Sequence, residues 1–217
     1  MKIYIVTDME GLPGATTWDD VDPTHPNHAH FAKLLTQQVT EAYHGAIAGG
    51  ATEVWVNDWH NVGLNIHPAG LPKDVRLIRG SNWIAPCLNE TFDGLAFIGM
   101  HSEMGHGCSP LAHTVTRNIA FIKVDGEVYG EYELIRRYAN CFGVPLIYAS
   151  GDSGVVQRFG GDVDIKVAVS KLKPRADRSR DFGGSVEVEV GYTDGTTHKA
   201  VYSNYLEAVT SLRFLMK

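Results

Sequence analysis

Cysteine and long apolar runs are scarce in this sequence. Its 217 residues include three cysteines, Cys87, Cys108 and Cys141, which are widely spaced and form no CxxC pair. These features argue against a disulfide framework, and we expect free thiols in a reducing cytoplasm. No stretch approaches about eighteen continuous apolar residues. Met1 leads directly into a strand-like segment, and no basic region followed by an apolar stretch stands before it. We therefore expect neither a membrane span nor a signal peptide.

Positive charge is also scarce. The sequence has 19 Lys and Arg against 25 Asp and Glu, a formal net charge of −6 with histidine neutral. Binding to nucleic-acid phosphates usually requires a basic patch, and no run of Lys and Arg supplies one, so nucleic acid is not an expected partner. Histidine, in contrast, is plentiful, with ten residues. That surplus is a first indication of metal chemistry.

Apolar segments of strand length alternate with segments of helical period. Residues 9–28, rich in Gly, Pro, Asp and His, are expected to form a long functional loop. Continuous apolar strands separated by helices indicate an α/β fold with a mostly parallel sheet flanked by helices. The strands are expected at residues 2–7, 52–58, 75–80, 95–100, 144–150 and 164–170, and the long helices at 29–48 and 131–142.

Two hairpins are expected beside this sheet. The first spans residues 119–130 with an Asp-Gly turn, and the second follows residue 184 with another Asp-Gly turn and then a final helix. The strands of the second hairpin alternate apolar and polar residues, unlike the earlier ones. We expect residues 1–170 to form an α/β metal-binding catalytic domain. Residues 171–217 would add a small α+β appendage, a β-hairpin plus a helix, or complete the same compact domain.

Two carboxylates stand close together after the first strand. Asp8 and Glu10 follow the segment IYIVT and are separated by one residue. Like charges so near one another repel, and each raises the pKa of the other. A solvated loop, a nearby cation or a metal would each make the pair tolerable.

Histidines follow two further strands. His60 comes after the strand at 52–58, and His101 comes directly after the strand at 95–100. The carboxyl ends of parallel strands share one edge, where ligands bind, so these residues are expected to meet Asp8 and Glu10 there. Glu131 begins a helix, whose dipole favours a carboxylate, and His113 lies in a loop before the next strand.

This mixture of imidazole and carboxylate ligands suits Zn²⁺, with Mn²⁺ or Co²⁺ as alternatives. Two metals that share a carboxylate would use all the ligands and remove the repulsion between neighbouring acids. Each residue taken alone also has an ordinary explanation, such as a solvated turn, a surface histidine or an acid at a helix N-terminus. The metal hypothesis depends on their joint placement.

Five motifs in register resemble the M55 family of D-aminopeptidases. They are TDMEG at 7–11, VNDWH at 56–60, GMH at 99–101, AHT at 112–114 and GE at 130–131, and the resemblance extends to about residue 152. It implies an aminopeptidase with two zinc ions per subunit, which uses metal-activated water to cut short peptides that begin with a D-amino acid, D-alanine especially. It also implies a homo-oligomer, a decamer of stacked pentamers.

The resemblance further assigns roles to individual residues. It implies metal ligands at Asp8, Glu10, His60, His101 and Glu131, with Asp8 shared by both metals, and a catalytic residue at His113, either an acid–base group or a nucleophile. Two alternatives stay open: a related dinuclear amidase or peptidase for other cell-wall-derived or γ-linked peptides, and a non-catalytic oligomeric metal-binding scaffold.

Overall fold

The computed structural model describes residues 1–80, 83–107, 109–161, 163–173, 175–176 and 178–215. Cys108, one of the three cysteines expected to be free, lies outside these residues, whereas Cys87 and Cys141 are free thiols. Within the described part of the chain, no helix is long and apolar enough to cross a membrane.

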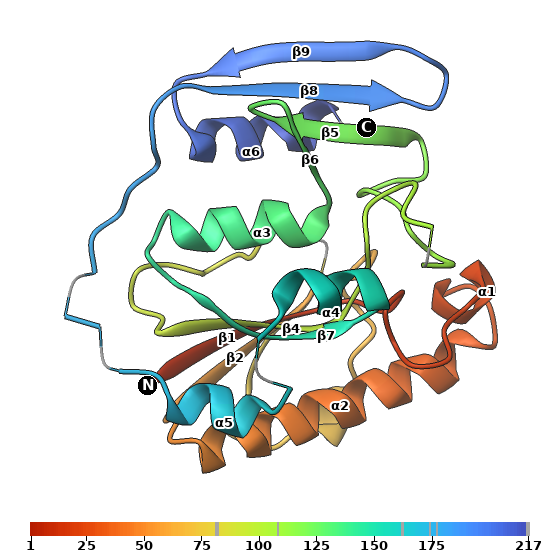
Figure 1. Ribbon diagram of the computed structural model, residues 1–217. Helices are drawn as coiled ribbons and strands as arrows, with labels where there is room; N and C mark the ends of the chain where they lie inside the picture. The colour runs from red at the N-terminus through yellow and green to blue at the C-terminus, as the bar shows by residue number, and fades with distance from the viewer. Residues whose placement is uncertain (81–82, 108, 162, 174, 177, 216–217) are drawn as a thin grey trace.

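A parallel sheet with strand order β3-β2-β1-β4-β7 forms the centre of the molecule (Figure 1). β1 and β4 lie in its middle and are almost completely buried, which explains why their sequences are continuously apolar. The expected α/β fold with a mostly parallel sheet is thus confirmed. The five strands are β1 (Lys2–Thr7), β2 (Glu53–Asp58), β3 (Arg76–Ile78), β4 (Gly94–Met100) and β7 (Leu146–Gly151).

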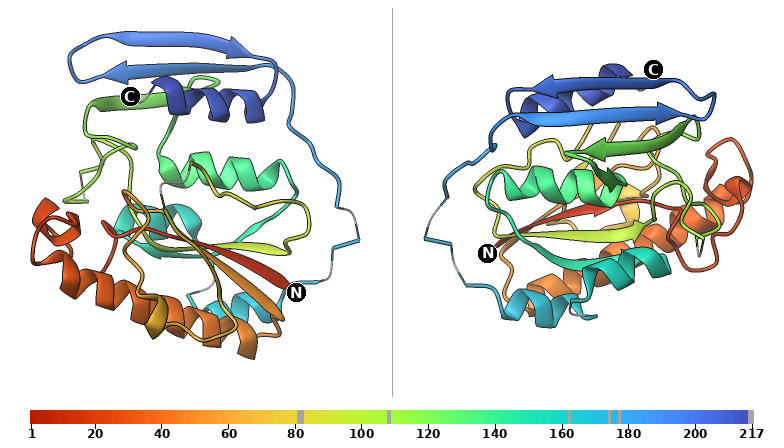
Figure 2. Two further views of the ribbon diagram at one scale, coloured as in Figure 1. Left: turned by 180° about the vertical axis from the view of Figure 1, so that it is seen from behind. Right: turned by 45° about the horizontal axis from the view of Figure 1, so that its top comes forward.

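Helices cover both faces of this sheet. α2 (His28–Ala48) and α5 (Ile165–Ser170) lie on one face, and α3 (Glu131–Asn140) lies on the other (Figures 1 and 2). α2 packs an apolar stripe that includes Leu35 and Val39 against the sheet. Three further short elements are α1 (Trp18–Val21), which lies within the expected loop at 9–28, the 3₁₀ helix η1 (Pro68–Gly70) and α4 (Ser153–Phe159).

A second, antiparallel sheet lies beyond α3 (Figures 1 and 2). Its order is β6-β5-β8-β9, so both expected hairpins form and pair with each other through β5 and β8. Buried side chains of this sheet, α3, α6 and the parallel sheet share one apolar core. The division of the chain at residue 170 stays a prediction. The elements are β5 (Ile119–Val124), β6 (Glu127–Tyr129), β8 (Val186–Tyr192), β9 (Thr197–Tyr202) and α6 (Tyr205–Leu215).

The prediction of a strand at 164–170 is wrong, because this segment forms helix α5 (Ile165–Ser170). The Asp164 side chain accepts a hydrogen bond from the Lys166 backbone and caps the helix. Ile165, Ala168 and Val169 are buried at helical spacing. Ile165 lies against Gly45 of α2 and Val169 lies against Gly49 at its C-terminal end, and the lack of side chains at these glycines lets the two helices approach closely. The β-branched composition therefore favoured a strand, but capping and tertiary packing decided for a helix.

Two glycines allow the ends of β1 and β4 to touch. A Cβ added to Gly11 would lie 1.9 Å from the Met100 carbonyl oxygen, and one added to Gly99 would lie 2.2 Å from the Asp8 carbonyl oxygen. Gly99 also has a φ of +71°, which L side chains rarely adopt. The Gly11 backbone N–H donates to the Gly99 carbonyl at 2.9 Å. This close approach brings the residues after β1 next to those after β4.

The substitution Gly99→Ala is expected to lower the free energy of unfolding by about 1–3 kcal/mol, because it combines backbone strain with a steric clash. Urea denaturation would measure the change. Gly184→Ala is the matched control, since an added Cβ there meets no atom within 4 Å. Equal stability of the two variants would contradict this explanation of the strand junction.

Candidate metal centre

The carboxyl ends of the parallel strands bring together all six residues predicted from the sequence. β1 and β4 are neighbours, and the chain runs from β1 to β2 on one side of the sheet and from β4 to β7 on the other, which creates a crevice at this edge. α1 and the segments 101–107 and 109–118 lie at the same end of the molecule (Figure 2). The six residues, all at most 8% exposed, are Asp8, Glu10, His60, His101, His113 and Glu131.

The first group contains Asp8, Glu10 and His60, each of which offers a ligand atom within 4.8 Å of the other two. His60 Nδ1 lies 3.0 Å from Asp8 Oδ1 and 3.0 Å from Glu10 Oε2. The Met9 backbone N–H donates to Asp8 Oδ1 at 2.9 Å and fixes the orientation of that carboxylate.

The other ring nitrogen of His60 is held by the main chain. Nε2 lies 2.8 Å from the Val21 carbonyl oxygen in α1, to which it donates its proton. α1 is shaped by Asp20, whose carboxylate accepts the N–H groups of Thr16 and Thr17. The bond to Val21 leaves Nδ1 as the nitrogen that faces the carboxylates, which is how metal-binding histidines are usually oriented.

Asp58, at the end of β2, is buried but holds the loop rather than entering the cluster. It accepts hydrogen bonds from the backbone N–H groups of Asn65 and Ile66 and from the Asn65 side chain. The same amide also donates to the His60 carbonyl at 2.8 Å. Asp58 therefore fixes the loop that carries His60.

The second group contains His101, His113 and Glu131, again with ligand atoms within 4.8 Å of one another. Glu131 Oε1 lies 3.1 Å from His101 Nε2 and 3.7 Å from His113 Nε2. The two imidazole rings are stacked with centres 4.2 Å apart. Each histidine uses Nδ1 to donate to a backbone carbonyl, that of Ser102 or of Leu111, so both Nε2 atoms face inward.

The backbone around Val115 is strained. Its φ is +62°, unusual for a β-branched residue, and Thr116 N–H donates to the Thr114 carbonyl across it, which forms a tight γ-turn. The turn directs the Val115 N–H toward Glu131 Oε1 at 2.7 Å. This strain therefore serves to hold a carboxylate of the cluster.

Arg158 in α4 connects the two segments that carry the second group. It pairs with Glu103, two residues after His101, and with Glu133, two residues after Glu131. The Glu133 carboxylate also accepts the Gly130 N–H at the start of α3. Arg158 therefore limits the movement of the His101 segment relative to α3.

Burial and mutual repulsion dominate the charges of the first group. Burial, followed by the charge of Glu10, raises the pKa of Asp8 to about 8. Burial would also raise the pKa of Glu10, but His60 lowers it well below its usual value. Burial would lower the pKa of His60, whereas Glu10 and Asp8 raise it well above its usual value. In the metal-free protein near neutral pH, Asp8 and His60 therefore hold protons.

The second group behaves similarly. Burial would lower the pKa of His101, but the neighbouring Glu131 raises it well above its usual value. The pKa of Glu131 is lowered, because His101 outweighs the opposing effect of burial. The pKa of His113 is lowered by burial and then by the charge of His101. His113 is therefore the neutral histidine of the cluster.

The donor set fits divalent metal ions. Three carboxylates and three imidazoles lie together away from water, an arrangement that is costly unless cations compensate the charge. Among the described residues, Glu10 Oε2 and His101 Nε2 form no well-aligned hydrogen bond, although each lies close to a partner of opposite charge, at 3.0 Å from His60 and 3.1 Å from Glu131. Two sets of converging nitrogen and oxygen ligand atoms of this kind are suited to zinc or a similar ion.

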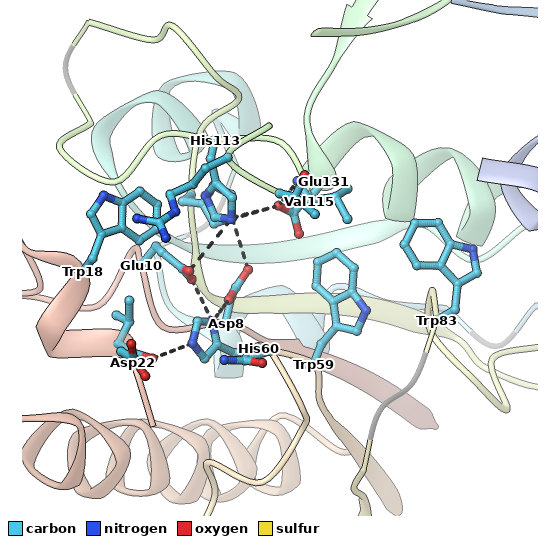
Figure 3. A pocket seen from close by; sticks show the side chains of 15 residues that line it. Asp8, Glu10, Trp18, Asp22, Trp59, His60, Trp83, His113, Val115 and Glu131 are labelled. Carbon is cyan, nitrogen blue, oxygen red and sulfur yellow. Dashed lines mark hydrogen bonds and ion pairs between the residues drawn. The ribbon is translucent and has the colours of Figure 1, made fainter. Parts of the chain in front are cut away.

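A cavity of about 440 Å³ opens onto the cluster. Figure 3 shows Trp18 beside His113 on one side, and Trp59 and Trp83 on the other. Arg117 also lines the cavity. No motif in the sequence marks these wall residues, although three of the four tryptophans gather here and Arg117 follows His113 by four positions.

Comparison with known proteins identifies the family. The sequence model of the M55 peptidases, described as D-aminopeptidase, matches residues 1–181. The chain belongs to the M55 peptidase family. The resemblance inferred from the five motifs is thus confirmed.

Two known proteins are similar to this M55 chain. A D-aminopeptidase of Bacillus subtilis (strain 168) is 27% identical over 157 residues, which cover 70% of this chain and 56% of that protein. The alignment thus spans little more than half of that relative's length. One solved structure is similar, that of the Zn-dependent D-aminopeptidase DppA from Bacillus subtilis, which is described as a self-compartmentalizing protease. The structural alignment has a TM-score of 0.86 at 19% sequence identity and covers 100% of this chain and 96% of the DppA chain. The two proteins therefore share a fold.

Zinc added to the metal-free M55 chain near neutral pH is expected to release protons. Asp8, with a pKa of about 8, and His60 and His101, with raised pKa values, are protonated there, and each must lose its proton to become a ligand. Calorimetry in buffers of different ionisation enthalpy would count the protons, and affinity should fall as the pH is lowered. Zinc binding without proton release would contradict the charge assignment.

Proposed function

We propose that this chain is a zinc-dependent aminopeptidase that removes an N-terminal D-amino acid, such as D-alanine, from short peptides. One observation carries the proposal: three buried histidines each donate one ring N–H to a backbone carbonyl and turn the other nitrogen toward three buried carboxylates. Membership of the M55 family and the description of its model support peptide hydrolysis and the D-configuration.

We assign two zinc ions to each subunit, with Mn²⁺ or Co²⁺ as possible substitutes. Asp8, Glu10 and His60 would hold one ion, and His101 and Glu131 would hold the other. Asp8 would be a ligand of both. The position of Asp8 supports this sharing, since Oδ1 lies 3.0 Å from His60 and Oδ2 lies 3.4 Å from His101. Zinc bound there would polarise a peptide carbonyl and lower the pKa of a water molecule.

We assign His113 the movement of protons during hydrolysis. Its Nδ1 keeps a proton through the bond to the Leu111 carbonyl, so the unprotonated Nε2 faces the cavity. Nε2 can accept a proton there and pass it to the leaving amine. The stacking of His113 on His101 and its edge contact with Trp18 restrict the ring to this orientation. Direct nucleophilic attack by Nε2 is the alternative role.

The chain is also proposed to act as a homo-oligomer. The solved relative is described as self-compartmentalizing, which supports an assembly that encloses the active sites. A decamer of stacked pentamers and a location in the cytoplasm stay predictions from the sequence.

The test is a panel of short peptides given to the zinc-loaded protein. We expect release of the N-terminal residue from D-alanyl peptides, slower or no release from L-alanyl and γ-glutamyl peptides, and loss of activity after removal of zinc with a chelator. A zinc-loaded, folded protein that hydrolyses none of these peptides would contradict the proposal.

Two variants serve as controls for this panel. His113→Ala should keep the zinc content and reduce kcat by roughly 10²–10⁴-fold, the usual contribution of an acid–base group. Asp8→Ala should lose zinc as well as activity. Unchanged turnover in His113→Ala would exclude its catalytic role, and full zinc content in Asp8→Ala would exclude a shared ligand.

A further inference from the structure

Arg117 differs from the other residues that line the cavity. The carboxyl groups there are those of Asp8, Glu10, Asp22 and Glu131. Among the described residues lining the cavity, Arg117 is the only side chain with a permanent positive charge. Its guanidinium is thus a fixed positive charge on the cavity wall that can attract an anionic group of a ligand.

The guanidinium of Arg117 is positioned but not paired. Its central carbon lies 5.0 Å from the centre of the Trp18 ring, which is a cation–π contact. In the described part of the chain it forms no ion pair or side-chain hydrogen bond. Its N–H groups are therefore available to a carboxylate, which an arginine binds in a bidentate manner.

The distance between Arg117 and the cluster limits the length of the ligand that can reach both. Trp18 links Arg117 to the centre, because its ring lies 5.0 Å from the guanidinium and 5.2 Å from the His113 ring. Arg117 is thus at most about 10 Å from His113, the sum of those distances, and one or two extended residues of ~3.3–3.6 Å each fit between them.

We propose that Arg117 binds the C-terminal carboxylate of the peptide substrate and makes the enzyme selective for dipeptides and tripeptides. This assignment rests on the proposed peptidase function. The N-terminal residue lies at the zinc ligands, the leaving residues extend past His113 and Trp18, and the terminal carboxylate meets Arg117.

The test compares D-Ala-Gly with its C-terminal amide on the zinc-loaded protein. We expect wild type to prefer the free acid by about tenfold to a hundredfold in kcat/KM, the range for a hydrogen bond to a charged group. Arg117→Gln should remove this preference by raising KM for the acid, with little change for the amide. Arg117→Lys keeps the positive charge but loses the bidentate geometry of the guanidinium, so it should retain only part of the preference for the acid.

Arg136→Gln is the matched control. Arg136 is also exposed and lies over an aromatic ring, that of Tyr132 at 5.8 Å, but it does not line the cavity. This variant should keep the preference for the acid, and circular dichroism would verify that each variant is folded.

The outcomes separate the two proposals. Hydrolysis of acid and amide with equal kcat/KM by wild type overturns the role of Arg117 while peptidase activity stands. The role of Arg117 is also overturned if Arg117→Gln lowers kcat/KM equally for the acid and the amide, or if it changes only the oligomeric state. No hydrolysis of any peptide in the panel overturns the peptidase function and the role of Arg117 with it.

Discussion

Asp8 and Glu10 are buried side by side and repel each other, so the fold has to supply compensating charge around them. His60 does so for both carboxylates, with Nδ1 3.0 Å from each. The metal-free cluster additionally retains a proton on Asp8. Divalent cations would replace these protons and turn the repulsion into shared ligation.

The surrounding structure mainly fixes orientation. Carbonyl groups of Val21, Ser102 and Leu111 select which nitrogen of each histidine faces the centre. The strained turn at Val115 and the ion pairs of Arg158 restrain the segment after β4 relative to α3. Ligands drawn from several parts of the chain thereby form a preorganised site, which favours both metal affinity and catalysis.

The sequence predicted the parallel sheet and the six cluster residues because both depend on strong local signals. Buried parallel strands are continuously apolar, and Asp8, His60 and His101 follow them directly. Helix α5 was missed because its β-branched residues favour a strand, while its packing against α2 is a tertiary effect.

The cavity walls could not be predicted for a different reason. Arg117 is defined by its contact with Trp18, almost a hundred positions earlier, and the positive φ of Val115 arises from the three-dimensional path of its loop. No periodic pattern encodes such contacts.

The central claim is that one edge of the sheet builds a site for two metal ions. Anomalous diffraction at the zinc absorption edge, from crystals of the zinc-loaded protein, tests it most directly. The account predicts two peaks, one among Asp8, Glu10 and His60 and one beside His101 and Glu131, with a carboxylate oxygen of Asp8 next to each. A single peak, or none at these residues in a protein that is active with zinc, would contradict it.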